Sequence, residues 1–136
     1  MEAYKHKVQY YETDQMAIVH HSNYVRWMEE ARVDYLEQLG CPLDSLEREG
    51  VVSPVVSLEC RYRSPARFPE TVTVTVKVTE FRGVRLRLGY ELRGVDGRLC
   101  AEGKSEHCFT GPDGRPVNMK RSFPEVWEKL SAQVEG

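Results

Sequence analysis

The chain has 136 residues, of which 40% are hydrophobic and 29% are charged, and 19 Lys and Arg against 21 Asp and Glu give a net charge of −2. A chain of this length buries about two thirds of its unfolded surface on folding, so we expect a single domain over residues 1–136. The balanced charge excludes a general attraction to nucleic acid or anionic lipid. No segment approaches the roughly 18 apolar residues of a membrane helix, so we expect no membrane partner.

The N-terminal segment lacks the apolar stretch of a signal peptide, which predicts a cytoplasmic location. The cysteines Cys41, Cys60, Cys100 and Cys108 lie far apart and never form a C-x-x-C pair. We therefore expect reduced thiols in the core or at the surface, and no zinc or redox motif.

Hydrophobic alternation with a period of two predicts a first strand over Tyr4–Tyr11. After a polar stretch, apolar residues recur at helical spacing up to Gly40, which predicts one long amphipathic helix that ends at this glycine. Ser22 and Asn23 are candidates for its N-cap. The stretch LDSLEREG predicts a short helix ended by Gly50.

Four further strands are predicted after residue 51, where the period of two resumes. The breaker SPARFP, the pair Asp96-Gly97 and the stretch GPDGRP separate or end these runs. Strands joined by short turns pair antiparallel, so we expect a four-strand meander packed on the long helix in an α+β fold. The tail PEVWEKLSAQV predicts a terminal helix with Pro124 near its start.

The stretch ETDQMAIVHHSNY, residues 12–24, carries the candidate chemistry. Asp14 lies about eight residues before a helix whose first N–H groups carry partial positive charge. A loop that folds back would set this carboxylate, as base or nucleophile, beside a backbone oxyanion site, which suits hydrolysis of an activated acyl bond such as a thioester. On spacing alone, a turn-capping role for Asp14 is favoured, because Asp is common in turns.

Other chemistries find little support. The chain has no G-x-S-x-G nucleophile elbow and no glycine-rich phosphate loop. A metal site would use Asp14, His20 and His21, but adjacent histidines in an extended segment point to opposite sides, so we expect no metal and no cofactor. His6 and His107 fall in predicted strands without visible partners, and we interpret them as structural.

Two glutamates on the long helix offer a second source of a carboxylate. Glu30 falls on the polar face and is expected to be solvated. Glu29 falls nearer the apolar stripe, where a buried pairing with Arg32 or another arginine would make it structural first and catalytic second.

Arginines gather around SPARFP and around the following strand connection. One interpretation is that they hold the phosphates of a nucleotide-bearing acyl carrier. The other is that they lie on the polar face of the sheet beside glutamates, as their alternation indicates. The cluster consists of Arg61, Arg63, Arg67, Arg82, Arg85 and Arg87.

One block of the sequence has a specific combination of residues: Tyr11, Asp14, Ile18-Val19, His21, Asn23-Tyr24, Trp27, Glu29, Ala31-Arg32 and Leu39-Gly40. This block resembles the opening of hotdog-fold acyl-CoA thioesterases of the 4-hydroxybenzoyl-CoA thioesterase type. The resemblance covers nearly the whole chain, since CRYRSPARF with the valine-rich strands is similar to the second block of that family. RPVNM is similar to the family's strand end before the last helix.

The resemblance implies a long central helix wrapped by a curved antiparallel sheet of about five strands, with a C-terminal helix. It also implies homodimers or homotetramers with the active site at the dimer interface. The family's catalytic aspartate falls on Asp14, and its carbonyl-polarising backbone N–H falls on or near His21. The substrate-binding candidates are Asn23, Tyr24, Trp27 and Met28 for the acyl group and Arg63, Arg67, Arg82 and Arg85 for the coenzyme A phosphates.

The chain departs from the family pattern at a few positions. Ala17 stands where many relatives have glycine, which predicts a loop that avoids φ > 0 at this residue. His20 stands where an aromatic residue is common, and FPET replaces a more usual Gly-Asp pair. We expect these changes to alter which acyl group fits while leaving the carboxylate in place.

The leading hypothesis is a cofactor-free acyl-CoA thioesterase that releases a free acid and coenzyme A. Asp14 serves as nucleophile or general base, and the helix N-terminus serves as oxyanion site. Two alternatives stay open, namely the same chemistry on acyl carrier protein and a non-catalytic acyl-CoA binding module on the same fold. The acyl group, aliphatic or aromatic, is left open by the sequence.

Overall fold

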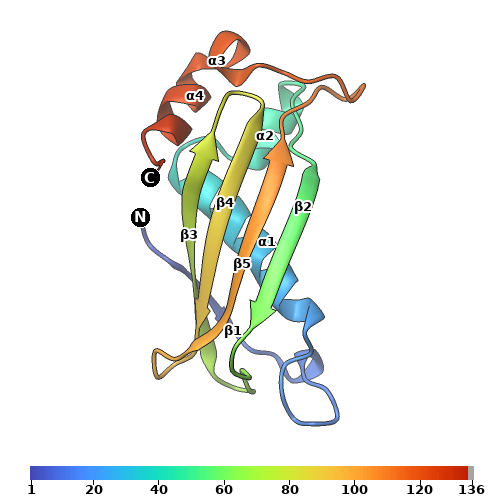
Figure 1. The fold of residues 1–136 in the computed structure, drawn as a ribbon, viewed down its shortest axis with the longest axis vertical. Coiled ribbons are helices and arrows are strands. Elements are labelled where there is room, and N and C mark those ends of the chain that lie inside the picture. The colour runs from blue at the N-terminus through green and yellow to red at the C-terminus, as the bar shows by residue number, and fades with distance from the viewer. Residues whose placement is uncertain (135–136) are drawn as a thin grey trace.

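The structure is a computed structural model that describes residues 1–134. It contains a five-stranded antiparallel sheet with a long helix packed across one face (Figure 1). The elements are β1 (Tyr4–Lys7), a 3-10 turn (Tyr10–Glu12), α1 (Ser22–Gln38), α2 (Leu43–Arg48), β2 (Val55–Tyr62), β3 (Thr71–Phe81), β4 (Arg85–Arg93), β5 (Leu99–Cys108), α3 (Met119–Ser122) and α4 (Pro124–Ser131).

The strand order is β1-β3-β4-β5-β2, so the predicted four-strand meander is right for β3, β4 and β5 and wrong for β2. β2 pairs with β5 instead of β3, and Arg63 still donates its backbone N–H to Cys100 at 2.8 Å as the chain leaves the strand. The following connection contains Pro65 and Pro69, which have no N–H to donate. This stretch therefore crosses to β3 as an irregular loop and not as a hairpin.

The core lies between α1 and the inner face of the sheet. Trp27, Met28 and Ala31 on α1 are at most 1% exposed and meet the inward-facing valines and leucines of β3 and β4. The period-two and helical patterns in the sequence are confirmed by these two apolar faces. Burial of a single large side chain of this kind contributes about 1.5–3 kcal/mol to the hydrophobic stabilisation of the fold.

The two ends of α1 differ in how well the sequence predicted them. Gly40 ends the helix as predicted, with φ +82°, its N–H donating to Glu37 and the Cys41 N–H donating to Leu36, which is a Schellman motif. The predicted N-caps are wrong, because Ser22 is already the first helical residue. The Ser22 hydroxyl instead hydrogen-bonds His20 Nδ1 at 2.8 Å.

The inner face of β2 is only partly covered. Leu58 pairs with Ser105 and Cys60 with Gly103 in β5, so the predicted alternation of faces is confirmed. However, β2 is an edge strand, and Val56, Leu58 and Tyr62 remain 49%, 45% and 49% exposed. A long edge strand with exposed apolar side chains is an unusual feature for an isolated protomer.

The two ends of the sheet carry different structures. The C-terminal helices α3 and α4 cover one end, where Trp127 packs on Phe81 with ring centroids 5.0 Å apart, and the 12–20 loop lies at the other end (Figure 1). The predicted helix start at Pro124 and the Asp96-Gly97 turn are confirmed. None of the helices within residues 1–134 is long and apolar enough to cross a bilayer.

Candidate active site

The loop between the 3-10 turn and α1 folds back on itself. Asp14 donates its backbone N–H to Ile18 at 2.8 Å, and its carbonyl accepts the Ala17 N–H at 3.0 Å. Thr13 and Val19 form an antiparallel bridge across the base of the loop. Asp14 is therefore held within a tight turn close in sequence and space to the start of α1.

Ala17 has φ +61°, so the prediction that the loop avoids positive φ at this residue is wrong. The turn closes only because residue 17 bends in the left-handed sense between the Asp14 and Ile18 hydrogen bonds. An L-residue with a Cβ pays about 1–2 kcal/mol for this conformation. The exposed position of the Ala17 methyl adds no steric clash with the core.

The half-buried carboxylate of Asp14 has one oxygen engaged. Oδ1 accepts the backbone N–H of Met16 at 2.8 Å, which is the turn-capping contact that the spacing favoured. Oδ2 receives no hydrogen bond from any of residues 1–134. The same side chain is thus fixed in orientation by one oxygen while the other remains available.

The residues just before α1 leave one backbone donor unused. His20 donates its N–H to Glu12, Asn23 donates to His20, and the His21 carbonyl accepts the Tyr62 hydroxyl at 3.2 Å. In the described part of the chain, the His21 N–H donates to no acceptor. This N–H lies at the positive end of the α1 dipole, where a developing negative charge is stabilised.

The four predicted acyl-binding residues come together on the first turns of α1, and all of them are buried. Tyr24 accepts the Ala66 N–H at 3.1 Å through its hydroxyl, and burial raises the pKa of that hydroxyl, so it stays protonated. Trp27 donates its indole N–H to Glu12, and the Asn23 amide donates to the Glu12 carbonyl. Their contact with an acyl group, like that of Met28, stays a prediction.

Glu12 is a residue that the sequence did not single out. Its carboxylate accepts hydrogen bonds from the Gln9 N–H at 2.7 Å, His6 Nε2 at 2.9 Å and Trp27 Nε1 at 2.9 Å. Burial alone would raise its pKa, but these donors outweigh burial and lower it. The Gln9-to-Glu12 spacing of a capping box was the one local signal for it.

The sequence showed no partners for His6, and the structure supplies them. Its imidazole bonds Glu12, lies 3.4 Å from Glu30 Oε1 and stacks on Trp27 at a centroid distance of 4.6 Å. These partners were hidden from the sequence because they lie on other elements. The expectation that His6 is structural remains consistent with the contacts.

The predicted roles of the two glutamates on α1 are reversed. Glu30 is half-buried and accepts the Tyr4 hydroxyl at 2.5 Å, whereas Glu29 is exposed. The buried Arg32 donates to Ser53 Oγ at 3.2 Å and has no carboxylate within 4 Å among the described residues. The expected Glu29–Arg32 pair is therefore absent from the part of the chain that the structure describes.

His107, for which the sequence also showed no partners, hydrogen-bonds within the sheet. Its Nε2 hydrogen-bonds Ser105 Oγ at 2.8 Å, and Ser105 in turn bonds the Tyr90 hydroxyl at 2.7 Å. Burial and then Arg32 lower the pKa of His107 to about 4, while the Ser53 backbone opposes part of this shift. This buried polar chain lies under β4 and β5, and its imidazole is neutral near pH 7.

The four arginines predicted to bind phosphates differ in their surroundings. Arg63 pairs with Glu102, Arg85 with Glu106 and Arg82 with Glu80, at 2.5, 3.2 and 2.6 Å. Within residues 1–134, Arg67 has no carboxylate within 4 Å of its guanidinium. The ion pairs support the interpretation that Arg63, Arg82 and Arg85 belong to the polar face of the sheet. Arg67 is exposed and lies next to Ala66, which is hydrogen-bonded to the 12–20 loop.

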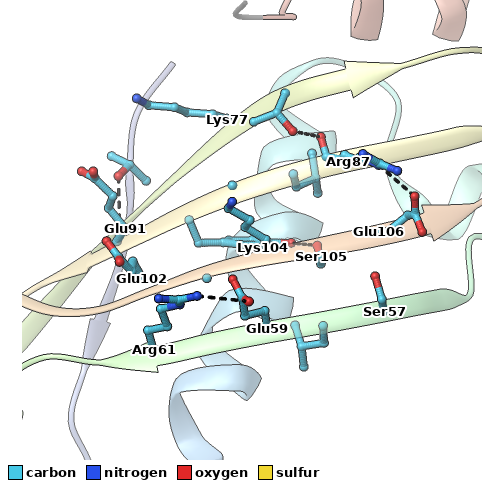
Figure 2. A pocket seen from close by; sticks show the side chains of 17 residues that line it. Ser57, Glu59, Arg61, Lys77, Arg87, Glu91, Glu102, Lys104, Ser105 and Glu106 are labelled. Atoms are coloured by element: carbon cyan, nitrogen blue, oxygen red, sulfur yellow. Dashed lines mark hydrogen bonds and ion pairs between the residues drawn. The ribbon is translucent and has the colours of Figure 1, made fainter.

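A groove with a volume of about 950 Å³ lies elsewhere, on the outer face of the sheet (Figure 2). Figure 2 shows charged side chains from β2, β4 and β5 pairing with one another across this face, among them Arg61 with Glu59 and Arg87 with Glu106. None of the loop residues around Asp14 lines it. The candidate site is therefore the loop and the start of α1, and not this groove.

Nothing in residues 1–134 resembles a metal centre, because no three His, Cys, Asp or Glu side chains gather in a ligating arrangement there.

Comparison with known proteins identifies the family. Residues 8–133 match the family model described as the thioesterase-like superfamily.

The chain belongs to the thioesterase-like superfamily. The predicted hotdog thioesterase family, its fold and the thioester-hydrolase class are thereby confirmed.

Similar proteins share most of the chain length. YneP of Bacillus subtilis (strain 168), whose assignment as an acyl-CoA thioesterase is provisional, is 34% identical over 120 residues, covering 88% of this chain and 87% of YneP. A crystal structure of DHNA-CoA thioesterase from Staphylococcus aureus has a TM-score of 0.92 at 32% identity, covering 96% and 89% of the two chains. The crystal structure of TT1821 from Thermus thermophilus has a TM-score of 0.88 at 38% identity, covering 98% and 99%.

Proposed function

We propose that this family member is an acyl-CoA thioesterase of the 4-hydroxybenzoyl-CoA thioesterase type, with Asp14 as the reacting carboxylate and the His21 N–H as oxyanion donor. One observation carries the proposal. A carboxylate with one oxygen fixed and one oxygen available lies on a loop that closes onto a helix start whose backbone N–H has no acceptor among the described residues. Acyl transfer needs this combination of base or nucleophile and oxyanion donor.

The reaction follows from these two groups. The thioester carbonyl oxygen accepts the His21 N–H, which polarises the carbonyl carbon. Asp14 Oδ2 either attacks this carbon, giving a mixed anhydride that water hydrolyses, or takes a proton from a water that attacks it. In both routes the C–S bond breaks and coenzyme A leaves as a thiol after protonation. A single backbone donor to the oxyanion contributes about 2.7–4 kcal/mol of barrier lowering.

Arg67 is the proposed contact for the coenzyme A phosphates. Ala66, its neighbour, is bonded both to the 12–20 loop through Val19 and to Tyr24 on α1, so Arg67 emerges directly beside the site. The nearby Glu70 carboxylate is occupied by Arg98 at 2.8 Å. A guanidinium without a carboxylate partner is suited to bidentate phosphate binding.

The proposed assembly is a homodimer in which two copies of β2 pair with each other. The other edge strand, β1, has four residues and carries the exposed Lys5 and Lys7, whereas β2 has eight residues and exposed apolar side chains. Short, lysine-bearing edges discourage strand pairing, and long apolar ones favour it. Because Tyr62 at the end of β2 bonds the His21 carbonyl, such a dimer would set the candidate site at its interface.

The proposed location is the cytoplasm, and the substrate is left to a screen. All four cysteines are free thiols, which is usual in a reducing compartment. Among the similar proteins, one is named for an aromatic substrate, 1,4-dihydroxy-2-naphthoyl-CoA, and others are named only for acyl-CoA. The panel should therefore include a dihydroxynaphthoyl-CoA beside short, medium and long aliphatic acyl-CoAs.

The experiment that tests the proposal is thiol release from this panel by the wild type and by Asp14→Asn. Asp113→Asn is the matched control, because Asp113 also accepts the N–H of the residue two positions on, at 3.0 Å, in a turn distant from the loop. We expect Asp14→Asn alone to lose activity. Equal activity of Asp14→Asn and wild type would reject the proposal.

A further inference from the structure

Glu12 lies where β1, the 12–20 loop and α1 meet, and no step of the proposed reaction uses it. Its side chain is buried, with the residue only 5% exposed. We propose that Glu12 is a positioning residue that sets the geometry between Asp14 and the His21 N–H. This inference rests on the proposed function and assigns to that site a residue that touches neither substrate nor reacting atoms.

The carboxylate of Glu12 joins three separate segments. Its donors are the Gln9 N–H in front of the 3-10 turn, the His6 imidazole on β1 and the Trp27 indole on the second turn of α1. Hydrogen bonds to a buried ionised carboxylate are stronger than neutral ones and depend strictly on direction. The 12–20 loop therefore starts from Glu12 in one fixed direction relative to α1.

The backbone carbonyl of Glu12 fixes the other end of the loop. It accepts the His20 N–H at 2.8 Å and the Asn23 side-chain amide at 2.9 Å. Asp14 is thus two residues from Glu12, and His21 is one residue from His20, which is hydrogen-bonded to Glu12. A shift of Glu12 therefore moves the two reacting groups relative to each other.

The surroundings of Glu12 keep it charged and in place. His6 is itself held by stacking on Trp27 and by Glu30, which accepts the Tyr4 hydroxyl. A glutamine at position 12 has the same shape, but its amide nitrogen would face an N–H donor and lose one of the three bonds. Glu12→Gln therefore loosens the loop without emptying the core.

The first test measures kcat, KM and binding for Glu12→Gln on an acyl-CoA that the wild type hydrolyses. We expect kcat to fall about 100-fold, since a displacement of about 1 Å can cost that much. The KM and the Kd of a non-hydrolysable S-alkyl-CoA thioether should stay within about twofold, because the ground-state contacts remain. The control is Val126→Ala, a buried truncation on α4 at the opposite end of the molecule (Figure 1).

Val126→Ala should lower Tm and leave kcat unchanged. The two variants are compared by their fall in kcat for a similar fall in Tm. If Glu12→Gln lowers kcat no more than Val126→Ala does, Glu12 only stabilises the fold and the inference is wrong. Should Glu12→Gln fail to fold, His6→Phe carries the test, because phenylalanine can keep the stacking on Trp27. It removes one of the three donors and leaves the carboxylate charged, so we expect a smaller fall in kcat with an unchanged Kd for the thioether.

The second test is a double-mutant cycle with Asp14→Asn. A residue that acts through Asp14 has nothing left to position in that background, so Glu12→Gln should lower the residual rate no further. A multiplied loss in the double variant would overturn the inference. Full activity of Asp14→Asn would instead reject the proposed function, so the two failures are distinguishable.

Discussion

The buried imidazole of His107 makes the stability of the protein depend on pH in a defined interval. Its folded-state pKa is lowered from 6.5 to about 4, first by burial and second by Arg32. Between these two values the unfolded chain binds a proton that the folded chain does not bind. Stability is therefore complete above about pH 6.5 and decreases as the pH falls toward 4, by about 1.4 kcal/mol for each pH unit.

Between pH 7 and pH 5 this difference amounts to a loss of about 2 kcal/mol in the free energy of unfolding. Glu12 and Glu70 contribute almost fully throughout this interval, because carboxyl groups with lowered pKa values lose their stabilising contribution only in more acidic solution. Urea unfolding of the wild type and of His107→Gln, at equal protomer concentration, measures the contribution of His107 to this pH dependence. We expect the variant to lose about 2 kcal/mol less than the wild type over the same interval.

Parallel losses in the two proteins would refute the reasoning, because they would mean that the His107 imidazole titrates in the folded state as it does in the unfolded chain. Glutamine is the suitable replacement, since it can still hydrogen-bond Ser105 and carries no proton equilibrium in this range.

Two further predictions concern the substrate carrier and the assembly. Arg67→Ala should raise the KM for acyl-CoA about tenfold and leave hydrolysis of the matching acyl-pantetheine unchanged. The control is Arg48→Ala, because Arg48 is an exposed arginine paired with Asp44. Equal effects of Arg67→Ala on both substrates would exclude a phosphate contact. Leu58→Lys should convert the proposed dimer to monomers in sedimentation experiments, whereas Val95→Lys, at a more exposed apolar side chain of the β4–β5 hairpin, should not. A wild type that sediments as a monomer and remains active would contradict the β2 interface.

The sequence predicted the elements better than their pairing. The period of the apolar residues was enough for α1 and for the strands after residue 51, because local geometry decides which face a side chain occupies. The first strand was predicted too long, since β1 ends at Lys7 and Tyr10–Glu12 form a 3-10 turn. The position of β2 beside β5 depends on a pairing between residues about forty to fifty positions apart, to which the turn signals contribute nothing. The meander prediction failed for this reason.

The candidate site was predicted in part. Asp14 and His21 followed from their place before a helix and from the family resemblance, and the fold brings them to one loop. The role of Glu12 in that loop stayed hidden because its donors come from three different elements. The left-handed Ala17 was predicted wrongly, since closure of the turn outweighs the intrinsic preference of alanine.

The most direct test of the central claim is kcat/KM of Asp14→Asn relative to the wild type on the best acyl-CoA of the panel, with Asp113→Asn measured beside it. Loss of a positioned base or nucleophile predicts a fall of about 100-fold or more, with the fold, the oligomeric state and the rate of the Asp113→Asn control unchanged. A wild-type rate in Asp14→Asn would show that the carboxylate on this loop does not carry the reaction.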